Sequence, residues 1–190
     1  MKKEIFKKFG PIQIDDARIN ETCNAYFKWK DLNTYISNCS HRGINMPDAI
    51  SEPMGCYCLD LIWNRGDEVG DATNPRTGEK IEFKATSRFE GDLSSFGPKC
   101  KFDDLIFLRF NLDDNLLFIY DLNINSEEFG KLPANSKETI QDQKNQGRRP
   151  HVSLQKLFID QKHKDEGDRS PDIIFDIRRC TIVDNRTVKK

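Results

Sequence analysis

Three charged residues, Asp71, Glu82 and Lys84, have the types and spacing that metal-assisted hydrolysis requires. Asp71 lies in the run VGDAT and the other two lie in KIEFKAT, and the turn-forming letters NPRTG separate the two runs. Because successive side chains of a strand point to opposite faces, Glu82 and Lys84 share one face. A hairpin closed at NPRTG would fold Asp71 back beside Glu82.

The chemistry of this trio favours a metal site. Two neighbouring carboxylates repel each other unless a cation lies between them, and Mg²⁺ takes one or two carboxylates while keeping several waters. We therefore predict that Asp71, Glu82 and the backbone carbonyl of Phe83 bind Mg²⁺. Lys84 would position or deprotonate a water molecule and offset charge on a phosphate. The alternative is a solvated hairpin of alternating charge, in which Glu82 and Lys84 only face water.

A loop that follows the hairpin, RFEGDLSSFGPKCKFDD, contains residue types that contact DNA. Ser94, Ser95 and Lys99 can bond phosphate oxygens, and Phe96 can either wedge into DNA or pack inside the protein. The alternative is an ordinary connecting loop whose Phe96 belongs to the core.

A further polar segment, residues 135–157, is dense in side chains that read base edges, and we call it the reading segment. Arginine can bond the O6 and N7 acceptors of guanine, so Arg148 and Arg149 are the first candidates for base contact. Two consecutive arginines on a strand point in opposite directions, so one of them is expected to hold a phosphate. Further candidates are Gln143, Asn145 and Gln146. The alternative is a polar, solvated turn before Pro150.

The motif and its surroundings resemble a known enzyme family. Asp71, Glu82 and Lys84 match the PD-(D/E)XK nuclease motif. The blocks IEFKATS, DLSSFGPKCKFDDLIFL and TIQDQKNQGRRPHVSL, in this order, resemble one family of small type II restriction endonucleases, which cut an interrupted GC–N–GC palindrome. The resemblance covers roughly residues 52–157. Gly70 stands where the motif's name has proline, a position that varies widely in such nucleases.

The resemblance implies an α/β, restriction-endonuclease-like fold, with a small mixed sheet flanked by helices. It also implies Mg²⁺-dependent cleavage of both strands at a short G/C-rich palindrome in double-stranded DNA, a symmetric homodimer, and a cognate DNA methyltransferase in the host. Glu52 is the candidate for an acidic residue that reaches toward the metal or its water, although it can equally complement a helix N-terminus. Two alternatives remain: a structure-specific or repair nuclease of the same fold, and a non-catalytic DNA-binding protein.

The elements that would position these residues can be placed along one domain, residues 1–190. Apolar residues at helical spacing predict a helix from about Asp15 to Cys39, including Ala25, Trp29, Leu32, Tyr35 and Ile36, and a second from Asp48 to about Asn64. These two helices form a helical part, 15–64, ahead of a catalytic sheet, 69–121. LIFLRF and LLFIYDL predict a buried antiparallel pair, Val152–Gln161 a short helix, and DIIFDIRRCTIV a last strand.

Composition adds weaker constraints. The net charge of −1 does not by itself indicate nucleic-acid binding, but many DNA enzymes concentrate positive charge on one face. No apolar run is long enough to cross a membrane, and the basic start lacks the apolar stretch of a secretory signal. We therefore expect a cytoplasmic protein without membrane association, in which all six cysteines are reduced.

Overall fold

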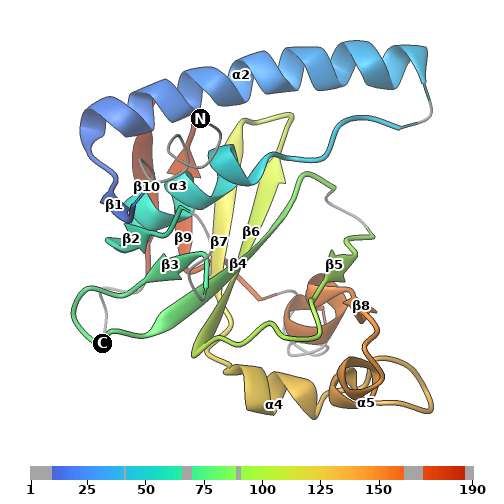
Figure 1. Ribbon diagram of the computed structural model, residues 1–190. Coiled ribbons are helices and arrows are strands. Elements are labelled where there is room, and N and C mark those ends of the chain that lie inside the picture. The colour runs from blue at the N-terminus through green and yellow to red at the C-terminus, as the bar shows by residue number, and fades with distance from the viewer. Residues whose placement is uncertain (1–9, 41, 66–69, 89–90, 161–168, 187–190) are drawn as a thin grey trace, which may run out of the picture.

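The computed structural model describes residues 10–40, 42–65, 70–88, 91–160 and 169–186. Within these ranges the chain forms a mixed eight-stranded sheet in the order β1-β2-β3-β4-β6-β7-β9-β10 (Figure 1). The strands are β1 (Ile12–Gln13), β2 (Ile62–Trp63), β3 (Ala72–Thr73), β4 (Lys80–Thr86), β6 (Asp104–Asn111), β7 (Leu116–Asp121), β9 (Ile173–Asp176) and β10 (Thr181–Asn185). Of these pairings only β4–β6 is parallel. The predicted α/β fold is confirmed.

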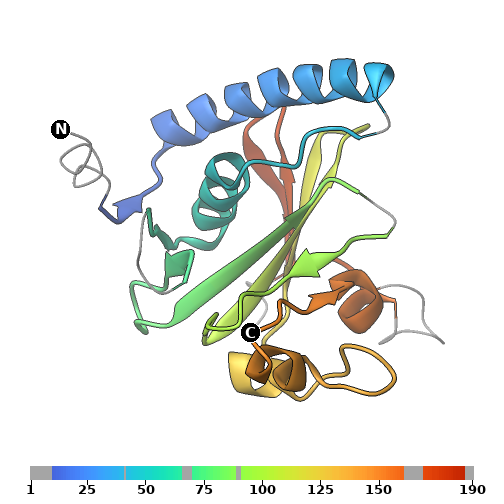
Figure 2. The same ribbon diagram turned by 45° about the vertical axis from the view of Figure 1, so that its right-hand side comes forward.

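Helices and a second, two-stranded sheet cover this main sheet. The helices are α2 (Asp16–Cys39), α3 (Asp48–Leu59), α4 (Ser126–Gly130), α5 (Ile140–Asn145) and the π-helix η1 (Gln155–Ile159), and the small sheet pairs β5 (Ser94–Ser95) with β8 (His151–Val152). α2 and α3 lie on one face, whereas α4, α5, η1 and the small sheet lie on the other (Figure 2). The molecule is therefore a three-layer structure with the sheet in the middle.

The central pair, β6 and β7, is antiparallel and buried, as predicted. Its side chains alternate between two cores, as the period of a strand requires. Ile106, Leu108 and Phe110 join the core under α2 and α3. Leu105 and Phe107 join the core under α4, α5 and η1. Both faces of the central strand are apolar because both are covered.

A glycine allows α3 to lie close to the motif strand. A Cβ atom added at Gly55 would meet the Phe83 ring at 2.8 Å, closer than real Cβ contacts allow. Any larger residue at position 55 would push α3 away from β4. Since α3 also carries Glu52, this close packing helps to fix Glu52 relative to the motif strand.

Two predicted element boundaries are wrong. The second helix ends at Leu59 rather than near Asn64, because Asp60 adopts a left-handed conformation (φ 55°) and Ile62 and Trp63 pair with β3 instead. The run DIIFDIRRCTIV forms two antiparallel strands rather than one. Its turn includes Cys180, also left-handed (φ 54°).

Two predictions for helical segments are only partly correct. Asp15 caps α2 by accepting a hydrogen bond from the Arg18 amide, and Trp29 is buried. Leu32 and Tyr35 are exposed, because the chain beside that end of the helix packs near Asn33 and Ser37 instead. The segment predicted as the helix Val152–Gln161 contains only the short π-helix η1, because Val152 pairs in β8. Gln161 and Val69 lie outside the described residues.

Candidate active site

The predicted hairpin exists and brings Asp71 to Glu82. Ala72 pairs with Ile81, and the Asp71 amide donates to the Ile81 carbonyl at 2.8 Å. One oxygen of the Asp71 side chain accepts a hydrogen bond from the Phe83 amide at 2.7 Å. Asp71 is therefore fixed to the motif strand through its backbone and through its carboxylate.

The backbone at Gly70 explains why this chain departs from the motif's name. Gly70 has φ +80°, a left-handed conformation that glycine adopts readily. Proline is locked near φ −65° and cannot adopt it. Proline at position 70 would thus require a different entry into β3, and with it a different position for Asp71.

Glu82 and Lys84 point to the same side of β4 and form an ion pair, with 2.5 Å between Lys84 Nζ and Glu82 Oε1. Burial acts to lower the pKa of Lys84, but attraction and a hydrogen bond to Glu82, together with attraction to Asp71, outweigh it and raise that pKa. The ammonium also lies 5.1 Å from the centre of the Phe96 ring. Lys84 is therefore held as a cation between a carboxylate and an aromatic ring.

Glu52 joins this group from α3. Trp63 Nε1 donates to Glu52 Oε2 at 2.7 Å. Burial, followed by repulsion from Asp71, raises the pKa of Glu52 to about 8 although the Trp63 bond opposes the rise. Burial, followed by repulsion from Glu82, likewise raises the pKa of Asp71 to about 6, against the opposing effects of the Phe83 amide and Lys84. Three carboxylates thus repel one another around one lysine.

The chemistry of these donors fits a hard divalent cation. The pKa values of Asp71 and Glu52 are raised first by burial and then by repulsion from neighbouring carboxylates, and a bound cation would offset both effects. The Phe83 amide points toward Asp71, and the N–H and C=O of one strand residue face the same edge. The Phe83 carbonyl therefore faces that edge as well. Nowhere in the described ranges do three or more His, Cys, Asp or Glu side chains gather as a metal-binding group, so the fit rests on two carboxylates and a carbonyl.

The structure corrects part of the predicted DNA-contacting loop. Phe96 is fully buried with Phe102 and Phe129, so its ring packs in the core and does not wedge into DNA. Ser94 is also buried, because β5 pairs with β8. Ser95 is half-buried and Lys99 is exposed, so both remain candidates for phosphate contact.

The reading segment contains α5, the polar turn after it, β8 and the start of η1, rather than only a polar turn. Gln143 and Asn145 lie in α5, and Gln146 ends it. Arg148 and Arg149 follow Gly147 and are both exposed. Arg148 forms an ion pair with Glu138, with 2.5 Å between Nη2 and Oε1.

Comparison with known protein sequences shows which family this chain belongs to. The family model described as Bsp6I restriction endonuclease matches residues 14–161, which include both the hairpin and α5. The type II restriction enzyme Bsp6I of Bacillus sp. (strain RFL6) is 44% identical over 149 residues, which cover 78% of this chain and 85% of that protein. The chain belongs to the Bsp6I restriction endonuclease family. It is a type II restriction endonuclease, a site-specific deoxyribonuclease that acts on DNA. No solved structure matches it.

In this endonuclease several contacts attach the reading segment to loop 92–100, beside the candidate active site. The Phe96 amide donates to the Pro150 carbonyl at 3.1 Å, next to the β5–β8 pair. The buried Lys144 of α5 donates from Nζ to the Cys100 carbonyl at 3.2 Å. Cys100 in turn lies near Glu82, which after burial is the main reason that the pKa of its thiol is raised to about 12. Loop 92–100 thus connects α5 to the motif strand β4.

Sequence reasoning missed Glu138 and Lys144. Lys144 could have been found, because it lies four residues after the buried Ile140 and therefore shares the inward face of α5. Glu138 gave a weaker signal, its place directly before the capping box of Thr139 and Asp142. Side-chain partners gathered from both sides of that box cannot be deduced from spacing alone.

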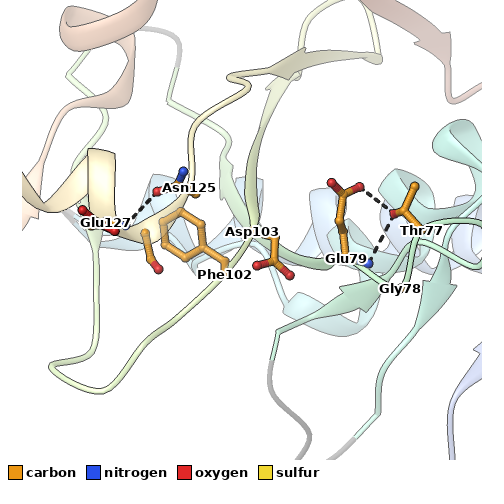
Figure 3. Close-up of a pocket in the computed structure, with 8 residues that line it drawn as sticks. Thr77, Gly78, Glu79, Phe102, Asp103, Asn125 and Glu127 are labelled. Atoms are coloured by element: carbon orange, nitrogen blue, oxygen red, sulfur yellow. Dashed lines mark hydrogen bonds between the residues drawn. The ribbon is translucent and has the colours of Figure 1, made fainter.

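A surface pocket elsewhere does not compete with this site. It lies between the turn of the β3–β4 hairpin and the start of α4 (Figure 3). Glu79, Asp103 and Glu127 line it, and Glu79 accepts a hydrogen bond from Thr77. Three carboxylates make this pocket unfavourable for a phosphate, and none of Asp71, Glu82 and Lys84 lines it.

The described part of the chain contains no helix long and apolar enough to cross a membrane.

Proposed function

We propose that this endonuclease cuts both strands of a short G/C-rich palindrome in a Mg²⁺-dependent reaction. The observation that carries the proposal is the contact of Lys84 with Glu82 beside Asp71, on a strand that loop 92–100 joins to the reading segment. In this arrangement a group that hydrolyses phosphodiesters lies next to a group that can read bases. The same juxtaposition would have no purpose in a protein that only binds DNA.

Asp71, Glu82 and the Phe83 carbonyl are the groups that would hold Mg²⁺. When bound, the ion polarises the phosphate and makes an attacking water more acidic. Lys84 stays protonated because its pKa is raised. Its role is therefore to donate hydrogen bonds that orient the water and to balance negative charge that builds up on the scissile phosphate. Glu52 would reach from α3 toward the metal or its water.

Recognition is assigned to the exposed polar groups of α5 and the turn after it. Arginine pairs with guanine through two hydrogen bonds, which suits Arg148 or Arg149 to a G/C-rich site. Gln143, Asn145 and Gln146 would add contacts to neighbouring bases or bridge to them through water. Ser95 and Lys99 would hold phosphates. Because a palindrome has a two-fold axis, we further propose that two copies act as a symmetric homodimer, alongside a cognate DNA methyltransferase in the host.

The first experiment is digestion of unmethylated plasmid DNA with Mg²⁺, in parallel with an EDTA control and the variant Lys84→Ala. Lys101→Ala is the matched control, because Lys101 is an exposed lysine outside the site. Discrete fragments from the wild type and Lys101→Ala, and from neither of the other two samples, would support the proposal. Sequencing the fragment ends would then give the site. Cleavage only of branched or mismatched DNA, or gel-shift binding without cleavage under any divalent ion, would overturn it.

A further inference from the structure

One carboxylate in the reading segment gathers several of the proposed base readers. Glu138 Oε1 accepts from Arg148 Nη2 at 2.5 Å and from Gln146 Nε2 at 3.2 Å. Glu138 Oε2 accepts from Gln143 Nε2 at 3.2 Å and from Asn135 Nδ2 at 3.2 Å. We call these four donors and Glu138 the Glu138 cluster. Its members come from both sides of the helix cap, so only the folded segment brings them together.

The four donors occupy all the acceptor positions of the Glu138 carboxylate, but the donor side chains keep hydrogen-bonding groups of their own that are not used. An ionised carboxylate has about four lone-pair positions, and four donors approach Glu138. Glu138 therefore has no free acceptor for a cytosine amino group. Arg148 has five N–H donors and gives one to Glu138, and each glutamine keeps one N–H and its carbonyl. The readers are held in place while their remaining groups stay free for base edges.

Arg149 offers a contrast within the same turn. It is as exposed as its neighbour Arg148, but within the described ranges no hydrogen bond or ion pair engages its guanidinium. Gly97, within loop 92–100, lies beside it, since a Cβ at Gly97 would be 3.9 Å from Arg149 Nη2. A guanidinium near loop 92–100 that has no partner in the described ranges is suited to bind a phosphate, because phosphate binding depends more on charge than on a fixed orientation.

From this arrangement we infer that Glu138 is a positioning residue that sets sequence discrimination by fixing Arg148, Gln143 and Gln146 as one reading surface, and that Arg149 holds a phosphate. The inference rests on the proposed function and deepens it by separating the two arginines. Holding the readers before DNA arrives reduces the rotamer freedom that binding must otherwise restrict. The carboxylate also keeps Arg148 from acting as a general attractor of phosphates.

This role has a signature that mere stabilisation of the segment lacks. Loss of the Glu138 charge leaves the readers unheld, so affinity for the cognate site should fall. The same loss makes the segment more positive, so affinity for unrelated DNA should rise. A residue that only stabilises the fold would lower both affinities together or change neither.

The test compares Glu138→Gln with Glu128→Gln. Both substitutions keep the side-chain volume and remove one negative charge, and Glu128 lies exposed on the neighbouring helix α4 without a side-chain partner in the described ranges. Binding to the cognate site, to sites with one base pair changed, and to unrelated DNA would be measured at one fixed salt concentration. We expect Glu138→Gln to reduce the ratio of cognate to unrelated binding by roughly tenfold or more. Glu128→Gln should leave that ratio within about twofold.

A second measurement keeps the inference testable if Glu138→Gln disturbs the segment. In a double-mutant cycle, Arg148→Ala should cost much less discrimination in the Glu138→Gln background than in the wild type, whereas Arg149→Ala should cost the same in both. Equal discrimination in wild type and Glu138→Gln, or additive effects with Arg148→Ala, would overturn the inference. Failure of the proposed function would look different, because the wild type itself would then produce no discrete fragments.

Discussion

The active-site hairpin and the reading segment hold their functional side chains by different means. Asp71 and Glu82 are fixed by strand pairing, by the Phe83 amide and by burial, and they share one nearby cation. Arg148 and Gln146 are exposed and Gln143 is half-buried, and side-chain hydrogen bonds to one carboxylate, Glu138, hold all three. In the hairpin, the carboxylates outnumber the one nearby cation, Lys84. In the reading segment, the carboxylate of Glu138 already accepts hydrogen bonds from all its donors.

This difference follows from what each region must bind. The pKa values of Asp71 and Glu52 are raised first by burial and then by repulsion from neighbouring carboxylates, so a cation bound at the proposed site would stabilise the folded protein. The pKa of Glu138 is lowered to about 2, chiefly by Arg148 and then by Asn135 and Gln146. The reading segment therefore keeps its arrangement at any pH where the enzyme would work. In the proposed function the hairpin would be completed by an ion, whereas the reading segment is already arranged before DNA binds.

The largest effect should come from Asp71→Asn. Loss of this charge should lower the rate of cleavage by about a thousandfold or more, while DNA binding without metal persists. Because the substitution removes repulsion with Glu82 and Glu52, the metal-free variant should melt at or above the wild-type temperature. Single-turnover cleavage and thermal melting would be measured beside Asp113→Asn, an exposed control in the β6–β7 turn. A variant that is both active and less stable would contradict the contrast drawn above.

The hairpin could be predicted from sequence because its geometry is local. NPRTG sets the turn, the period of a strand places Glu82 and Lys84 on one face, and pairing brings back Asp71. The sequence left open whether Phe96 packs in the core or contacts DNA, because its ring packs against Phe129 of α4, outside the loop, as well as against Phe102 of the same loop. The partners of Glu138 lie only three to ten residues away along the chain, but the helix cap and the turn after α5 set their directions, which spacing alone does not predict. The two strands in DIIFDIRRCTIV were missed because Cys180 is an unusual residue for a left-handed turn.

The next largest effect should come from Phe96→Ala, which tests whether Phe96 belongs to the core or contacts DNA. Phe96 is buried and lies under the Lys84 ammonium, so its loss should lower the free energy of unfolding by about 3–5 kcal/mol. DNA affinity of the folded variant should change little. Urea denaturation and gel shifts would be compared with Ser95→Ala, which should lose little stability. A variant with unchanged stability and weakened DNA binding would restore the original assignment of Phe96 as a DNA contact.

A smaller effect should separate the two arginines. Arg148→Ala should lose about 1–3 kcal/mol of discrimination between the cognate site and a site with one changed base pair. Arg149→Ala should weaken binding to all sequences about equally and reduce the salt dependence of binding by about one unit of slope. Titrations at several salt concentrations against both sites would measure the two quantities. The assignment fails if the two variants exchange these behaviours.

The smallest effect concerns Asp104, a carboxylate on β6 that is not among the proposed metal ligands. Burial and then repulsion from Asp121 raise its pKa to about 7, although the amides of Leu105 and Ile124 donate to it. Between the ordinary pKa of an aspartate and pH 7, the folded protein holds a proton that the unfolded chain has released. The contribution of Asp104 to stability therefore declines as pH rises through this window and is constant above it.

Asp104→Asn imitates the protonated form and keeps an oxygen that can accept from both amides. Its melting temperature should match the wild type near pH 4 and exceed it by an increasing margin up to about pH 7. Added Mg²⁺ should leave this margin unchanged, whereas Mg²⁺ should stabilise the wild-type hairpin and fail to stabilise Asp71→Asn. Melting curves from pH 4 to 8, with and without Mg²⁺, would show whether the two kinds of buried carboxylate differ in this way. If Mg²⁺ removed the advantage of Asp104→Asn, the cation would be acting at Asp104, which pairs with Ile81 of β4, and the metal site would have to be moved there from Asp71 and Glu82.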